Sequence, residues 1–420
     1  MAGKELRVNG RPIKLRAANY HVTYAGYGHH PPPHLVRRDI RLLVEANLNA
    51  LRSWPTPPPA YTDACDELGM FTTIEAPINL MIYAPGPRKD HGDNPALAEP
   101  FLALVERMLE TYRSHPSVLL WGLANESPYH DYFRQGALRI KQSDPSRPVF
   151  FGSDNRIGIG IPEMDVNDDH YPRDGHADIN QPGVITGGHW DEFPQDRPIM
   201  FTEWCHIHVN NQTELELDPG IDEYWGYYAQ THNEFVFNTP GILGGYLFKA
   251  APYRAIASRT PWRGFFDDDR RLNDLYWHVK KASSPIKLRL DEAVVNTSGN
   301  TLTIPIVNRH DFTDLSELSI TWRQGGRSGR VSADAVPHDT TAVQVPLVPG
   351  SGEPVEIVFT HPRGIEVDRY VWRQDTAVEP NAASAGPAPT LDEADGRITV
   401  TAGGVHWRID RATGRALHGG

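Results

Sequence analysis

The alternation of short apolar runs with longer segments of helical periodicity is the feature that most constrains this chain. It extends from about residue 12 to residue 283 of the 420 residues. The runs with strand character are IKLRAANYH, NALRS, MFTTIEA, SVLLWGLANE, PVFFGS, MDVNDDHY, RPIMFTEW and GILGGYLF. Segments such as PHLVRRDIRLLVEANL and DYFRQGALRIKQSD separate them and carry apolar residues at helical spacing. About eight strand–helix units of this kind predict an α/β fold, a (β/α)8 TIM barrel.

The pattern changes after Ser284 and Pro285. Short segments rich in β-branched residues follow at even spacing, separated by Gly, Pro, Asn and Asp, which predicts an all-β, immunoglobulin-like sandwich over residues 284–377. Residues 378–391, VEPNAASAGPAPTL, have the composition of a linker. Residues 392–420 are expected to form about three strands, too few to bury a core, and are interpreted as an incomplete further β-sandwich.

Composition excludes several classes of function. The formal net charge of −12 argues against nucleic acid as a partner, because such proteins present basic surface to phosphates. No apolar run approaches the ~20 residues of a membrane-spanning helix, and MAGKELRVNG lacks the apolar core of a signal peptide. A cytoplasmic protein without a membrane partner is therefore expected. The two cysteines, Cys65 and Cys205, predict neither a disulfide framework nor a zinc site.

Acidic residues stand where barrel strands end, and this is where barrel enzymes place their active sites. Glu126 follows the predicted fourth strand, and Glu203 ends the predicted seventh. Two such glutamates suit glycoside hydrolysis, in which one acid protonates the leaving oxygen and one carboxylate acts at the anomeric carbon. Spacing alone leaves other chemistries open, since many barrels carry acids at this end. Glu75, which ends the third strand, is interpreted as a structural acid paired with an arginine.

Longer stretches of the chain resemble glycoside hydrolase family 2, the β-galactosidase/β-glucuronidase group. The matching pieces lie in the family's order over residues 8–281. They are NGRPIKLRAANYH, RRDIRLLVEANLNALRS, CDELGMFTTIEAP, HPSVLLWGLANES, RPIMFTEWCH, GGYLF and GFFDDDRRLNDLYWHVKK. The segments after residue 284 are similar to the β-sandwich that follows the barrel in long β-galactosidases.

The resemblance implies roles for individual residues. Glu126 would be the general acid/base and Glu203 the nucleophile. Asn125 would bind the 2-hydroxyl of the sugar, and Arg52 would keep Glu203 ionised. The remaining substrate-binding residues that the resemblance implies are His21, Tyr171, His206 and Phe248, the last at a position usually held by tryptophan.

The sequence also departs from the family's pattern. Asn79 and Met81 replace the acid and histidine of a magnesium site, so no metal or cofactor is expected. Arg263 stands near the position of a sodium-binding asparagine in β-galactosidases and of a carboxylate-binding lysine in β-glucuronidases. The family's N-terminal sugar-binding domain, which contributes to the galactose site, has no counterpart in these residues.

The resulting hypothesis is a retaining exo-β-glycosidase that acts on terminal β-galactosides by double displacement through a glycosyl-enzyme. A β-glucuronidase-like enzyme on uronate-bearing glycans is the first alternative, and a non-catalytic sugar-binding remnant is the second. The expected partner is a carbohydrate substrate, and the sequence is compatible with a homo-oligomer.

Overall fold

A computed structural model gives the fold of two compact units, residues 1–351 with 356–371, and residues 352–355 with 372–420. The structure describes residues 3–54, 56–79, 95–152, 161–170, 196–205, 220–251, 264–296, 298, 300–374, 389–402, 405–411 and 416–419.

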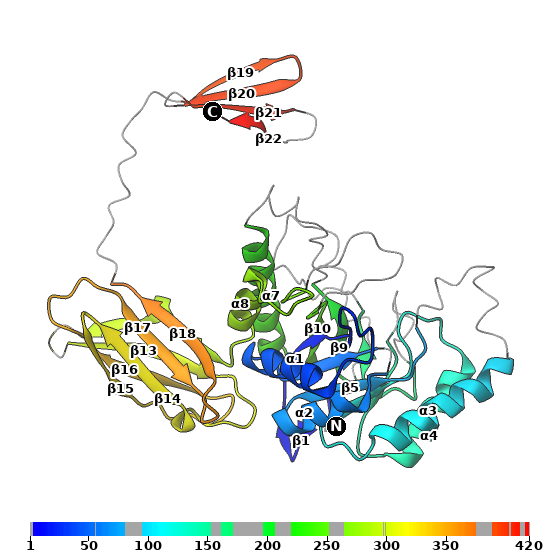
Figure 1. The fold of residues 1–420 in the computed structure, drawn as a ribbon. Helices are drawn as coiled ribbons and strands as arrows, with labels where there is room; N and C mark the ends of the chain where they lie inside the picture. Colours follow the sequence, from blue (N-terminus) through cyan, green and yellow to red (C-terminus); the bar gives the residue numbers. More distant parts are fainter. Residues whose placement is uncertain are drawn as a thin grey trace. The chain divides into compact units, whose positions relative to one another are not determined.

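Eight parallel strands form a nearly closed barrel (Figure 1). They are β3 (Leu15–Asn19), β4 (Ala50–Ser53), β5 (Phe71–Glu75), β6 (Val118–Gly122), β7 (Val149–Phe150), β8 (Asn167–Asp168), β9 (Ile199–Trp204) and β10 (Ile242–Leu247). Their order in the sheet is β7-β6-β5-β4-β3-β10-β9-β8. The backbone N–H of Asp165, just before β8, donates to the carbonyl of Val149 on β7 at 2.8 Å, which links the two end strands. The predicted barrel is confirmed.

Helices follow the strands and cover the outside of the barrel, because each has one apolar face. In α1 (Pro33–Glu45) the fully buried side chains of Val36, Ile40 and Leu43 recur at helical spacing. The other helices are α2 (Pro59–Leu68), α3 (Ala98–Tyr112), α4 (Asp131–Ser143), α7 (Ile221–Asn238) and α8 (Asp274–Ala282), with a 3-10 turn, η2 (Pro95–Leu97), before α3. Cys65 on α2 and Cys205 after β9 are buried free thiols.

A second apolar cluster fills the inside of the barrel. Leu15, Ala50, Leu120, Met200 and Tyr246 contribute to it from five different strands. Leu6 and Ile13 belong to the same cluster and flank a hairpin of β1 (Arg7–Val8) and β2 (Arg11–Pro12). Sequence analysis did not predict this hairpin, although its Asn9-Gly10 turn, with φ of 50° and 81°, is a typical hairpin signal.

The sandwich follows α8 and consists of two four-stranded sheets. The first holds β11 (Ile286–Leu288), β12 (Val294–Asn296), β13 (Thr301–Asn308) and β16 (Thr340–Pro346). The second holds β14 (Ser319–Gln324), β15 (Arg327–Val331), β17 (Val355–Thr360) and β18 (Glu366–Trp372). The 3-10 turns η5 (Leu290–Glu292) and η6 (Leu315–Glu317) connect strands of this domain. Buried and exposed residues alternate along β17, as expected for a sheet with one covered face.

The second unit contains one antiparallel sheet of four strands, one more than the sequence predicted. They are β19 (Thr390–Ala394), β20 (Arg397–Ala402), β21 (Val405–Asp410) and β22 (Ala416–Gly419). Leu391 and Trp407 are 71% and 52% exposed, so this sheet buries little apolar surface by itself. Among the helices of the described ranges, none is both long enough and apolar enough to cross a membrane.

Candidate active site

A polar layer lies above the apolar interior, where the barrel strands end. Along β3 the buried residues Leu15 and Ala17 are followed by Asn19, and along β4 Ala50 is followed by Arg52. Glu75 ends β5 in the same way. Alternate residues of a strand face the same side, so the change from apolar to polar along each strand creates the layer. It lies at the end of the barrel where enzymes of this fold bind substrate.

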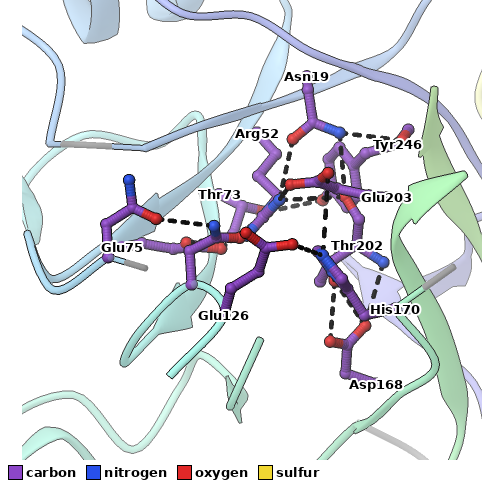
Figure 2. Close-up of polar contacts among 12 residues, drawn as sticks. Asn19, Arg52, Thr73, Glu75, Glu126, Asp168, His170, Thr202, Glu203 and Tyr246 are labelled. Carbon is purple, nitrogen blue, oxygen red and sulfur yellow. Dashed lines mark hydrogen bonds and ion pairs between the residues drawn. The ribbon is translucent and has the colours of Figure 1, made fainter. Parts of the chain in front are cut away.

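Arg52 on β4 is fully buried, and its guanidinium binds side chains from β3, β5, β9 and the loop after β6 (Figure 2). Nε and Nη2 donate to the two oxygens of Glu75 at 2.5 and 3.0 Å. Nη1 donates to Asn19 Oδ1 at 3.0 Å and to Glu203 Oε1 at 3.1 Å, and Nη2 donates to Asn125 Oδ1 at 2.6 Å. Burial by itself would lower the pKa of Arg52, but the carboxylates of Glu75 and Glu203 raise it above its usual range. The guanidinium therefore remains charged and fixes one oxygen of Glu203.

Glu126 and Glu203 meet at one histidine. The Nε2 atom of His170 lies 3.4 Å from Oε1 of Glu126 and 3.8 Å from Oε2 of Glu203. Because Oε1 of Glu126 and Oε2 of Glu203 both lie within 3.8 Å of Nε2 of His170, the two oxygens are separated by less than twice 3.8 Å. The side chain of His170 is fully buried, that of Glu203 is 3% exposed, and that of Glu126 is 14% exposed. Glu126 is therefore the more accessible of the two acids.

A chain of hydrogen bonds holds His170 from behind. Its Nδ1 lies 2.7 Å from the hydroxyl of Thr202, on β9. That hydroxyl donates to both oxygens of Asp168, on β8, at 2.7 and 2.8 Å. The backbone N–H of Thr202 donates to the same carboxylate at 3.1 Å. The imidazole is thus oriented by two neighbouring strands (Figure 2).

The loop after β6 places Asn125 and Glu126. The backbone N–H of Asn125 donates to the carbonyl of Ile78 at 3.0 Å, and its side-chain amide donates to Asn79 Oδ1 at 2.8 Å. Asn79 therefore holds the side chain of Asn125 in place. Glu126 has φ of 44°, in the left-handed region, which costs a non-glycine residue about 1 kcal/mol or more and is concentrated at functional sites.

Aromatic and cationic side chains surround the end of β10. His21 contacts Trp54 edge-on, with ring centroids 4.3 Å apart, and Phe248 at 6.0 Å. Burial, followed by the charges of Lys249 and Arg52, lowers the pKa of His21 well below its usual range, so this imidazole is neutral at pH 7. Burial also lowers the pKa of Lys249 to about 7, while Glu203 acts in the opposite direction. Lys249 is a buried amine that interacts with the carboxylate of Glu203.

The structure brings together six of the eight predicted site residues, namely His21, Arg52, Asn125, Glu126, Glu203 and Phe248. Tyr171 and His206 lie outside the described residues, as do Met81 and Arg263. Glu75 is paired with Arg52, as expected. Sequence analysis missed His170, Thr202 and Asn19. The signal for His170 is its place near the end of the strand-like run MDVNDDHY, one residue before Tyr171.

Comparisons with known proteins agree with this architecture. A β-galactosidase of Aeromonas hydrophila is 26% identical over 98% of this chain and 42% of its own length. The chain therefore spans about two fifths of that relative. A β-galacturonidase of Eisenbergiella tayi, solved with galacturonate, aligns with a TM-score of 0.56, 20% identity, and coverage of 67% of this chain and 53% of its own. A β-D-glucuronidase of Dictyoglomus thermophilum aligns with a TM-score of 0.56, 17% identity, and coverage of 67% and 52%.

At these identities the two solved structures show similarity of fold. The family model of the glycosyl hydrolases family 2 TIM barrel domain matches residues 1–236, more than half of the chain. With the barrel and its two strand-end glutamates in place, the chain belongs to glycosyl hydrolases family 2.

Proposed function

We propose that this chain is a retaining exo-β-glycosidase and that terminal β-galactosides are its first candidate substrates. The observation that carries the proposal is the meeting of Glu126 and Glu203 at His170, with Arg52 bound to the other oxygen of Glu203. Retaining enzymes place their carboxyl groups about 5–5.5 Å apart, and inverting enzymes about 6.5–9.5 Å. The limit set by His170 includes the whole of the shorter range and only the lower end of the longer range. The names of the sequence relatives favour the galactoside.

In the first step Glu203 is the nucleophile. Oε1 is held by Arg52, so Oε2, on the side of His170, is the oxygen that attacks the anomeric carbon. The bond from that carbon to the leaving oxygen breaks, and Glu126 gives its proton to this oxygen. The product is an ester between the sugar and Glu203.

In the second step Glu126 acts as a general base instead of a general acid. Glu126, now a carboxylate, takes a proton from water, and the water oxygen attacks the anomeric carbon. The ester bond breaks, Glu203 leaves as a carboxylate stabilised by Arg52, and Glu126 is protonated again. Asn125, held by Arg52 and Asn79, is positioned to bind the 2-hydroxyl of the sugar, a contact that strengthens at the transition state.

A β-glucuronide is the second candidate substrate. The observation that favours it is the buried amine of Lys249, which interacts with Glu203 and could also attract a uronate carboxylate. The names of the solved fold neighbours, a β-galacturonidase and a β-glucuronidase, point in the same direction. Rates on matched aryl β-galactosides and β-glucuronides separate these two substrates.

Azide rescue tests the two glutamates. Glu203→Ala should have no measurable turnover of an aryl glycoside until azide is added, and the product should then be the α-glycosyl azide, because azide attacks from the side of the missing nucleophile. In Glu126→Ala the rate of hydrolysis of a substrate with a poor leaving group should fall by about 10²–10⁴-fold. With azide present, the product of this variant should be the β-glycosyl azide. A first product of inverted configuration from the unmodified protein would contradict double displacement. Absence of turnover on every aryl glycoside would favour a sugar-binding protein.

A further inference from the structure

His170 lies between the two proposed catalytic carboxyl groups and contacts both with one nitrogen. Its Nε2 is 3.4 Å from Glu126 and 3.8 Å from Glu203, and its ring is fully buried. An imidazole nitrogen in this place affects the chemistry differently according to whether it carries a proton. The hydrogen bonds behind the ring decide that question.

The hydroxyl of Thr202 has a single proton, which it directs to Asp168. Both oxygens of Asp168 lie within 2.8 Å of the hydroxyl, and a carboxylate can only accept. Asp168 also accepts the backbone N–H of Thr202 at 3.1 Å, so this carboxyl group serves as the acceptor of both contacts. The hydroxyl oxygen must therefore accept from His170, at 2.7 Å. It follows that Nδ1 of His170 carries a proton in both the neutral and the charged ring.

With Nδ1 protonated, Nε2 has two possible states. If the ring is neutral, Nε2 has only a lone pair, and the contact with Glu126 is favourable when Glu126 is a protonated carboxylic acid. If Nε2 carries a proton, the ring is an imidazolium beside two carboxylates. In both arrangements exactly one proton lies between Nε2 and Glu126. With no proton there, a lone pair would face a carboxylate in a buried site, which is the least favourable case.

We propose that His170 and Glu126 share one proton, and that His170 is the positioning residue that keeps the acid loaded before each first step. This inference rests on the proposed function of Glu126. In the first step the shared proton leaves with the departing oxygen, and the pair becomes a Glu126 carboxylate beside a neutral His170. In the second step the proton taken from water restores the pair. Protons balance over the cycle, and His170 forms no bond to the sugar.

The charged groups joined to His170 directly or through Glu203 and Thr202 support a single shared proton. Glu126 and Glu203 contact its Nε2, Asp168 accepts from Thr202 behind the ring, and Arg52 and Lys249 interact with Glu203. The single positive charge of Arg52 offsets one of the two negative charges of Glu75 and Glu203. Lys249 also interacts with Glu203. The acids outnumber these two cations, so the cluster favours retention of a proton near His170.

Nitrogen NMR of labelled histidine tests the tautomer without any substrate. The resonances of His170 are assigned by their loss in His170→Phe, or by their shift in Thr202→Val. We expect Nδ1 to be protonated at every pH at which the protein is folded. In Thr202→Val, which removes the acceptor hydroxyl, a form protonated at Nε2 and bare at Nδ1 should appear. A bare Nδ1 in the unmodified protein would overturn the proposal.

The pH dependence of kcat/KM tests the shared proton. Without His170 the proton is held by Glu126 alone, so the basic limb of the profile should move to lower pH by about one unit or more in His170→Phe. Thr202→Val should move it in the same direction. The control is Thr73→Val, which removes another buried hydroxyl of the barrel interior, bonded to Tyr246 at 2.6 Å, and should leave the profile in place. An unmoved basic limb in both His170→Phe and Thr202→Val would overturn the proposal.

The two experiments distinguish failure of this inference from failure of the proposed function. If no glycoside is hydrolysed, the proposed function fails, but the NMR measurement still reports which nitrogen of His170 is protonated. If glycosides are hydrolysed and the basic limb is independent of His170, the inference alone fails. If His170→Phe does not fold, the inference is tested by the histidine NMR spectrum of the unmodified protein and by the pH profile of kcat/KM for Thr202→Val.

Discussion

A single buried guanidinium organises the polar layer at the end of the barrel. Arg52 binds Glu75 with two hydrogen bonds and Glu203 with one, and it also holds the amides of Asn19 and Asn125. A buried arginine is tolerated only with such partners, and removal of one partner of a buried pair costs roughly 3–5 kcal/mol. Glu75 is therefore the acid that makes a charged Arg52 possible at this depth, and Arg52 in turn orients the proposed nucleophile.

Gly122, the last residue of β6, leaves the space that Glu75 needs. A Cβ atom at this position would lie 2.2 Å from Cγ of Glu75 and 2.8 Å from the ring of Phe150. We expect Gly122→Ala to displace Glu75 from Arg52, with a loss of about 1–3 kcal/mol in stability and a loss in kcat/KM of roughly tenfold or more. Thermal melting and aryl glycoside kinetics measure the two effects.

The control for this prediction is Gly352→Ala, because a Cβ atom there meets nothing within 4 Å. It should leave both melting temperature and kcat/KM unchanged. If Gly122→Ala behaves like this control, Glu75 does not depend on the space beside β6.

The position of a residue at a strand end was enough to predict some of the site but not all of it. Glu126 and Glu203 follow long apolar runs whose ends are easy to locate. His170 follows β8, which is only two residues long and is surrounded by acids, so its strand end gives a weak signal. Thr202 lies inside the apolar run IMFTEW, where a threonine is typical of any strand. Its bond to His170 depends on the pairing of β8 with β9, which the sequence does not specify.

At the scale of elements, α7 packs against β9 and supports the segment that carries Glu203. The ring of His232 on α7 stacks on Trp204, with centroids 3.5 Å apart and an angle of 13° between planes. His232 is 1% exposed, and neither ring nitrogen has a hydrogen-bond partner among the described residues. Burial lowers its pKa to about 3, so the ring is neutral and serves as an apolar surface behind the nucleophile strand.

This pKa implies that His232 reduces stability in acid. Between about pH 6.5 and pH 3 the unfolded chain binds a proton at His232 that the folded chain does not bind, so stability is lost as pH falls through this window. His232→Phe keeps the stack and removes the titration. We expect it to stabilise the protein by about 2 kcal/mol more at pH 5 than at pH 8, measured by urea unfolding at both pH values.

His232→Ala provides the comparison, since it removes the stacked ring as well as the titration. It should destabilise the protein at both pH values through the cavity that it leaves. A gain in His232→Phe that is equal at pH 5 and pH 8 would mean that folding does not lower the pKa of this histidine.

The order and type of most elements were predictable because each strand and helix of the barrel has its own apolar pattern. The β1–β2 hairpin was not predicted, and β7 and β8 were predicted as strands but are shorter than their apolar runs. Their residues are fixed by contacts with the barrel interior, such as that of Ile13, and by the link between Asp165 and Val149, not by local periodicity. In the second unit, β22 lacks the β-branched residues that indicate a strand.

At the scale of the whole first unit, polar contacts join the barrel to the sandwich at the end opposite the glutamates. Asn47 donates to the carbonyl of Val367, on β18 of the sandwich, at 2.8 Å, and also to that of Lys280 on the barrel helix α8 at 2.9 Å. Lys281 pairs with Asp368 at 2.6 Å. Asp311, which follows β13, accepts from the backbone N–H of Lys14 and from the amide of Asn49, both at 3.2 Å. We expect these contacts to make the stability of each domain depend on the other.

Asp311 also faces Arg16, whose guanidinium lies 3.7 Å away and whose pKa is lowered by burial, with Asp311 opposing that effect. Asp311→Ala would leave the largely buried cation of Arg16, which is 14% exposed, without its carboxylate, so we expect a loss of roughly 3–5 kcal/mol in unfolding free energy. Because Asp311 is at the other end of the barrel from Glu203, kcat at 25 °C should be unchanged. Urea unfolding, followed by tryptophan fluorescence and by residual activity, measures both.

The matched control is Glu292→Ala, which breaks an exposed ion pair with Arg289 at 3.4 Å and should cost less than about 1 kcal/mol. If barrel and sandwich unfold together, fluorescence and activity of Asp311→Ala will fall in one shared transition at lower urea. If instead activity survives the first fluorescence transition, the sandwich unfolds separately, and the buried pair of Arg16 and Asp311 does not couple the two domains.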